Sequence, residues 1–323
     1  MSQRSKSLKE KKPKSDTVLA QNSLKNARAD LKSAKVLYES ECYPNAIYHL
    51  QQSLEKSWKS FGFYYGIITE GMARSNDIIG HKGSKVCIRT IVAFKKVVGY
   101  TRREVKALKN LRETDTTDQT AVVLNEDLII QFDHGVDELI TGLNNFTANE
   151  DKIRGMPYDE MKKIIDPLMQ LDSSLNETVQ KLDDPQIKAE ICEKIRDGSY
   201  KFWRPLVAGS PHADKILREC LWEKLTDDVI VHLMKCTLRG VGVTGPLFPL
   251  AVITQVHEQT TRYGMDNHSP DEIYTATHPM IQLFPQIHAI SETTLNNLER
   301  LYTIIPPDEL IDDISEDKGE PAP

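Results

Sequence analysis

The chain has 323 residues, of which 39% are hydrophobic and 27% charged, and its formal net charge is −6. This apolar share is enough for a core, and the most apolar run, near Val241 to Ile253, is shorter than the roughly 18 residues that span a membrane. The charged start lacks the apolar part of a signal peptide and the cysteines form no CxxC pair, so we expect a cytoplasmic protein with no membrane contact, no metal and no cofactor.

The two ends of the chain carry opposite charge. Residues 1–20 begin with many basic and almost no apolar side chains, whereas residues 306–323 are acidic and end in Pro-Ala-Pro. Such segments bury too little apolar surface to offset the entropy of ordering, so we expect two disordered tails. A basic tail can touch nucleic acid, and the alternative is a merely solvated tail.

Between the tails, apolar residues recur at helical spacing and no segment shows sustained strand alternation. The first two helices are expected from Leu24 to Tyr38 and from Ala46 to Phe61, and a third from about His81 to Val98. The short connection between the first two predicts that they are antiparallel neighbours. The chain is therefore predicted to be all-α.

The next predicted helix begins at a capping box formed by Thr101 and Glu104. One of its faces is apolar, and the other carries four basic residues: Arg102, Arg103, Lys106 and Lys109. Basic side chains on one helix face neutralise phosphates without reading sequence, so these four are our candidate nucleic-acid-binding residues. The alternative is a solvated helix face.

Further helices are expected at about 124–143, 158–182, 185–197, 211–222 and 226–239, and Asp184-Pro185 and Ser210-Pro211 each have the order of an N-cap and an N1 proline. A glycine-rich segment follows them. Residues 240–245 read Gly-Val-Gly-Val-Thr-Gly, a literal GxGxxG, which binds a pyrophosphate only between a strand and a helix. Here a helix precedes it and Pro246 follows, so we expect a hinge or turn between helices. A helix through about Tyr263 comes next, and Ser269-Pro270 is a strong start signal for another.

One turn apart on the second predicted helix lie Gln51, Glu55 and Lys59, with the acid before the base, which is the favourable order. This row is either a stabilised helix surface or a helix–helix interface. An interface of this kind can be self-complementary about a two-fold axis, so we expect a homodimer.

The run from Ala27 to Ser60 resembles the HEPN family, named for higher eukaryotes and prokaryotes nucleotide-binding. The positions that match its pattern are Ala27, Asp30, Leu31, Ala34, Tyr43, Ala46, Tyr48, His49, Gln51, Gln52, Glu55, Lys56 and Lys59. Residues 250–275 resemble the later helix of members with an Arg-Tyr-Pro-Asp signature, with Gly264 in place of the proline. The resemblance implies a HEPN-like bundle in two parts, residues 21–103 and 246–305, enlarged by a helical insertion at residues 104–240.

The resemblance also implies a function linked to RNA, commonly in a dimer. Many members are ribonucleases with an Arg-x4–6-His motif, which by position can only be Arg262 and His268 here. The arginine would stabilise the transition state and the histidine would accept the 2′-hydroxyl proton, without a metal. Other members bind RNA, or pair with a small nucleotidyltransferase in toxin–antitoxin systems.

From these observations we expect a HEPN-like RNA- or nucleotide-linked binding module, as one half of a toxin–antitoxin or defence pair. Two alternatives stay open. One is a metal-independent endoribonuclease that uses Arg262 and His268 as catalytic residues. The other is a helical scaffold for protein interactions.

Overall fold

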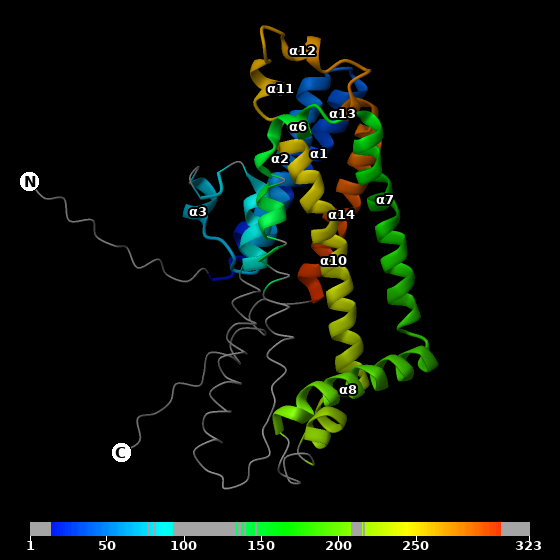
Figure 1. Cartoon of the computed structure of the whole chain (residues 1–323). Helices are drawn as coiled ribbons and strands as arrows, with labels where there is room; N and C mark the ends of the chain where they lie inside the picture. The colour runs from blue at the N-terminus through cyan, green and yellow to red at the C-terminus, as the bar shows by residue number, and fades with distance from the viewer. Residues whose placement is uncertain are drawn as a thin grey trace, which may run out of the picture.

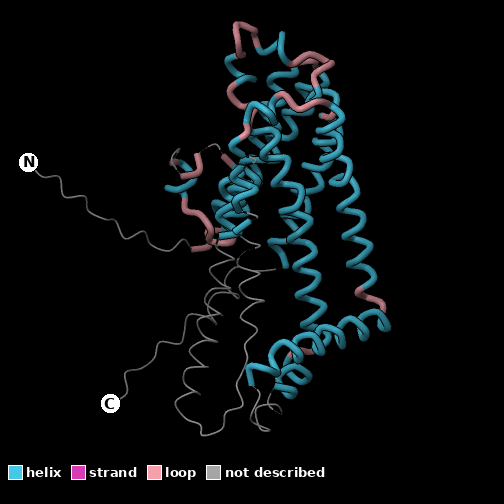
Figure 2. Tube along the Cα trace, viewed as in Figure 1, coloured by secondary structure: helices cyan, strands magenta, loops and turns pink. Residues whose placement is uncertain are grey.

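The computed structural model describes residues 14–304, except for residues 76–77, 81, 93–133, 135–136, 139, 146, 208–214 and 216. In this part of the chain the regular secondary structure is helical, and Met265 and His268 form an isolated β-bridge rather than a strand (Figure 2). The predicted all-α fold class is confirmed.

The first two helices, α1 (Thr17–Glu39) and α2 (Tyr43–Tyr64), form a hairpin. Asp16 caps α1 by accepting from the backbone N–H of Leu19, and its own N–H donates to the carbonyl of Phe63 at the end of α2. The helices are therefore antiparallel, as predicted. Because α1 begins at Thr17, residues 17–20 belong to the bundle and not to the basic tail to which we assigned them; residues 1–13 lie outside the described residues.

After the hairpin come the short helix α3 (Glu70–Arg74) and a helical segment at residues 83–92. This segment packs closely on α2, because a Cβ added to Gly62 would lie 2.9 Å from Ile68 and 3.0 Å from Val86. It corresponds to the helix predicted from His81 to Val98, whose two ends lie outside the described residues.

The region predicted as an insertion contains α6 (Glu150–Arg154), α7 (Tyr158–Lys181), α8 (Pro185–Val207) and a π-helical turn at Cys220–Lys224. The carboxylate of Asp184 accepts from the N–H groups of Gln186 and Ile187 at 2.9 and 3.0 Å, so the predicted start of α8 is confirmed. The predicted start at Ser210-Pro211 lies outside the described residues.

The long helix α10 (Asp227–Gln255) runs without a break through the Gly240–Pro246 segment. The hinge that we predicted there is wrong. A Cβ at Gly242 or Gly245 would lie 3.2 Å from a side-chain carbon of Leu175 or Leu171, so the glycines let α10 approach α7 closely. This packing, together with the burial of Pro246, offsets the helix-breaking tendency of the segment.

By length and composition, the helical stretch Asp227–Tyr263 could cross a membrane. The unbroken helix thus corrects our expectation that the run near Val241–Ile253 is too short. Half of its apolar window is buried inside the molecule, and Leu247, Leu250 and Ile253 are completely buried in the core. A core helix passes the same test, so this feature alone is weak support for a membrane span.

The main core joins α1, α2, α6, α7, α10 and α14 (Phe284–Ile304), and Figure 1 shows α7, α10 and α14 running alongside one another. Ile153, Met161 and Ile165 lie in this core, so residues of the predicted insertion share it with the segments on either side, 21–103 and 246–305. A smaller core, made of Leu182, Cys192, Ile230 and Val231, joins α8 to the start of α10.

Three short helices, α11 (Thr260–Tyr263), α12 (Pro270–Ile273) and α13 (Pro279–Gln282), follow α10 at one end of the bundle. We call residues 260–273 the cap; it forms the top of Figure 1. The indole N–H of Trp58 in α2 donates to the carbonyl of Leu247 in α10 at 3.1 Å. This bond ties the helix that leads into the cap to the first hairpin.

Candidate functional site

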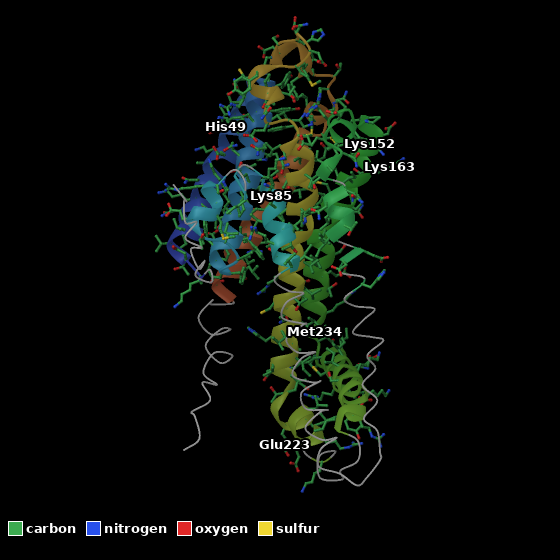
Figure 3. The ribbon with its side chains drawn as sticks, turned by 60° about the vertical axis from the view of Figure 1, so that its left-hand side comes forward. His49, Lys85, Lys152, Lys163, Glu223 and Met234 are labelled. Carbon is green, nitrogen blue, oxygen red and sulfur yellow. The ribbon has the colours of Figure 1, made fainter. Side chains whose placement is uncertain are left out.

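Three polar residues of the family pattern meet on the hairpin of α1 and α2. The carboxylate of Asp30 forms an ion pair with the Lys56 ammonium, and its Oδ1 lies 3.2 Å from His49 Nδ1. The Asp30 side chain is only 15% exposed, whereas both of its partners are about one-third exposed. Asp30 therefore fixes the orientation of a histidine and a lysine that reach the surface. Figure 3 shows His49 near the cap end of the molecule, far from Glu223 at the other end.

Next to this group, the cap contacts α2 through Arg262. Its guanidinium carbon lies 5.7 Å from the centre of the Tyr48 ring and 5.0 Å from that of Tyr263, both within cation–π range. The rings of Tyr48 and His49 in turn meet edge to face at 5.6 Å. Arg262, Tyr48 and His49 thus form a continuous cationic and aromatic surface, which we call the α2–α11 surface.

His268 lies in a tight turn that follows α11. Its backbone N–H and carbonyl both bond to Met265, and the two residues between them, Asp266 and Asn267, have φ angles of 51° and 66°. Positive φ at both central residues is typical of a type I′ turn, which suits the short side chains of Asp and Asn. Gly264 has φ 74°, and a Cβ there would lie 2.1 Å from the His268 carbonyl oxygen. Proline is locked near −65°, so it could not occupy this position.

The predicted catalytic pair, Arg262 and His268, is therefore located on the same cap, and both side chains are exposed. The two side chains have different neighbours. Arg262 lies over the rings of Tyr48 and Tyr263, whereas His268 Nδ1 lies 3.8 Å from Glu272 Oε2. The Ser269 backbone N–H donates to this Glu272 carboxylate and lowers its pKa, so the acid stays charged beside His268. No described contact joins the arginine to the histidine.

The row Gln51, Glu55 and Lys59 is not on the surface. Gln51 and Glu55 are 2% and 4% exposed, and Glu55 pairs with Lys59 at 2.6 Å. The helical segment at residues 83–92 packs against the row at Glu55, since a Cβ at Gly83 would lie 3.3 Å from the Glu55 Cα. The interpretation as a stabilised helix surface is therefore wrong, and the row lies at an interface between helices of one chain. The homodimer stays a prediction, without this row as its motive.

Sequence reasoning missed a buried group beneath the cap. His257 is completely buried, its Nδ1 lies 2.8 Å from the Tyr274 hydroxyl, and its Nε2 has no hydrogen-bond partner among the described residues. Burial lowers the pKa of His257 to about 3 and that of His278, whose ring lies 5.6 Å away, to about 4. Both imidazoles are therefore neutral at pH 7. No spacing in the sequence could have identified them, because the α10–cap junction brings them together.

Two other parts of the predicted site remain untested. Arg102, Arg103, Lys106 and Lys109 lie outside the described residues. Within the part of the chain that the structure describes, no three His, Cys, Asp or Glu side chains are grouped so that they could hold a metal ion.

Comparison with known proteins adds one finding. Residues 20–72, which span α1, α2 and the start of α3, match the family described as HEPN domain. No curated protein and no solved structure matches the chain.

Proposed function

We propose that this chain, whose residues 20–72 form a HEPN domain, is an RNA- or nucleotide-linked binding module. The observation that carries the proposal is the position of Arg262 on the ring of Tyr48. Tyr48 belongs to the HEPN match, and Arg262 belongs to the late segment that resembles the family's later helix. The two segments are distant in sequence but contribute to one surface.

The chemistry of the α2–α11 surface suits such a ligand. A guanidinium can donate two parallel hydrogen bonds to a phosphate, and aromatic side chains offer stacking faces for bases. Tyr48 is half-buried and Arg262 is exposed, so the ring holds the cation in place while leaving its donors accessible. Phosphate contacts of this kind supply most of the sequence-independent affinity for nucleic acid.

A salt series with a labelled single-stranded RNA, followed by fluorescence anisotropy, tests the proposal. We expect wild type to bind, and Arg262→Gln to bind about 10- to 150-fold more weakly, because one charge-assisted contact contributes about 1.5–3 kcal/mol. The slope of log affinity against log salt should fall by about one.

Arg300→Gln is the matched control. Arg300 is an exposed arginine two residues from Tyr302, which stacks on Tyr64 at the end of α2 opposite to Tyr48. We expect it to bind like wild type. Equal losses in the two variants would show that general charge, and not the α2–α11 surface, holds the RNA; no binding by wild type would contradict the proposal and leave the helical scaffold as the alternative.

The predicted basic helix belongs to the same proposal. Arg102→Glu combined with Lys106→Glu should weaken RNA binding and lower its salt slope. Unchanged affinity and slope would mean that this face is merely solvated.

A metal-independent endoribonuclease is the second candidate. The observation in its favour is that the rigid turn at Gly264–His268 keeps Arg262 and His268 on one exposed cap. RNA cleavage in the presence of EDTA checks it. A chain that binds RNA but leaves it intact under these conditions is a binding module.

The proposal further includes a homodimer in the cytoplasm and a nucleotidyltransferase partner in a toxin–antitoxin or defence pair. Its support is the HEPN match. Light scattering across the micromolar range checks the dimer, and a nucleotidyltransferase gene next to this one would favour the pair.

A further inference from the structure

Tyr263 is the most prominent aromatic side chain of the cap. It is 72% exposed, although tyrosine normally buries most of its ring. It ends α11, and its backbone N–H donates to the carbonyl of Gln259 at 2.9 Å. The exposed ring is thus attached to a backbone that a helical hydrogen bond holds in place.

The turn that follows makes the support rigid. Gly264 donates its N–H to Thr260, and Met265 and His268 exchange two backbone hydrogen bonds. Arg154 reaches the same place from α6, since its Nη1 lies 3.6 Å from the Met265 sulfur and its Nε donates to the carbonyl of Val256. An aromatic ring held in this way loses little entropy when a flat ligand stacks on it.

Arg262 contacts the same ring, with its guanidinium carbon 5.0 Å from the ring centre. An aromatic ring and a phosphate donor therefore lie next to each other on the cap. The α2–α11 surface continues directly into Tyr263 through Arg262.

The charges around the ring limit what can bind. Asp266, Asp271 and Glu272 are all exposed on the cap. Their negative charge opposes the dense phosphates of a double helix, in which both backbones crowd the same surface. The same charge opposes the binding of a single strand far less, because a single strand presents one unpaired base to the ring.

We propose that Tyr263 is a stacking platform for an unpaired base and that the ligand of the α2–α11 surface is single-stranded RNA. This inference rests on the proposed function and names its ligand class. Stacking on Tyr263 adds to the affinity that the phosphate contact of Arg262 supplies.

The test compares four probes by anisotropy or competition: a single-stranded RNA, its duplex, an abasic strand of equal length and charge, and AMP. We expect the single strand to bind best and the abasic strand to bind about tenfold more weakly, as expected for one lost stacking contact. Tyr263→Leu should lose a similar factor for the single strand only, whereas Tyr263→Phe should keep the affinity. Trp222→Leu is the control, because Trp222 is 40% exposed in the π-helical turn Cys220–Lys224, and Figure 3 shows Glu223 of this turn at the end of the molecule opposite to the cap.

The outcomes separate this inference from the proposed function. If wild type binds none of the probes, both are overturned. If wild type binds RNA but Tyr263→Leu binds it equally well, or if the duplex or abasic strand competes as strongly as the single strand, the stacking platform is overturned and the binding module is not. Thermal melting of Tyr263→Leu checks that the variant is folded.

Discussion

The guanidinium of Arg262 lies over the ring of Tyr48, at 5.7 Å from its centre, and so joins a four-residue helix late in the chain to the second helix of the HEPN domain. Tyr48 is held by the packing of α2, so the cation is positioned before any ligand arrives. The contact brings two segments that are distant in the sequence into one surface, to which we assign RNA binding by proposal. His268, the other residue of the predicted pair, lies beside Glu272 instead and makes no described contact with Arg262.

The close approach of α10 and α7 predicts opposite effects for two glycines of one helix. Gly242→Val should destabilise the protein by about 1–3 kcal/mol, because even its Cβ would lie 3.2 Å from Leu175. Gly240→Ala meets no atom within 4 Å and should stabilise it by about 0.5–1 kcal/mol through helix propensity. Urea denaturation monitored by circular dichroism measures both; the same sign for the two changes would mean that α10 does not pack on α7 in this way.

The buried pair of Glu55 and Lys59 predicts a large effect of removing one partner. Lys59→Met should destabilise the fold by about 3 kcal/mol, because it removes a cation that pairs with a buried carboxylate. Adding Glu55→Gln to that variant should restore part of the loss. Lys162→Met removes a cation from the exposed pair with Asp166 and should leave the unfolding midpoint nearly unchanged. Equal midpoints for Lys59→Met and wild type would show that the row is solvated after all.

Buried neutral histidines predict acid sensitivity. Burial lowers the pKa of His257 from 6.5 to about 3, so below pH 6.5 the unfolded chain binds more protons than the folded chain. The contribution of His257 to the free energy of unfolding should therefore be fully present above that pH and be lost on acidification. The loss should amount to about 2 kcal/mol between pH 6.5 and about pH 4.5.

Urea denaturation across that pH range measures the loss. His257→Phe should have a flatter profile than wild type, even if the lost contact with Tyr274 lowers its stability at neutral pH. The exposed His268 provides the control, because His268→Ala should keep the wild-type slope. A wild-type profile that is flat down to about pH 4.5 would show that His257 is not held neutral by burial.

If the chain is a ribonuclease, His268→Ala should lower the rate of cleavage about 10²–10⁴-fold without changing the melting temperature. The stability should persist because the side chain is exposed and packs little. Cleavage by this variant at the wild-type rate would remove His268 from the site.

Local signals predicted much of the fold. The spacing of apolar residues gave α1 and α2, and Asp184-Pro185 marked the start of α8. Ser269 and Glu272 form the capping box expected of their spacing. In each of these places the residues that decide the structure are close together in the sequence.

Tertiary packing decided the features that were predicted wrongly. Glycine and proline normally end a helix, but α10 continues through Gly240–Pro246 because α7 fills the space beside the glycines. Glu55 and Lys59 have the order of an exposed pair, but the segment at residues 83–92 packs against Glu55 and helps to bury it. Arg262 was predicted as a site residue, but its contact with Tyr48 depends on how α10 carries the cap to α2.

Hydrogen–deuterium exchange of the full chain, with and without single-stranded RNA, tests the central claim most directly because it locates the ligand without any substitution. Peptides that cover α2 around Tyr48 and the cap around Arg262 and Tyr263 should exchange more slowly when RNA is bound, while peptides of α8 should not change. Protection confined to other parts of the chain, with these peptides unaffected at saturating RNA, would contradict the assignment of the α2–α11 surface.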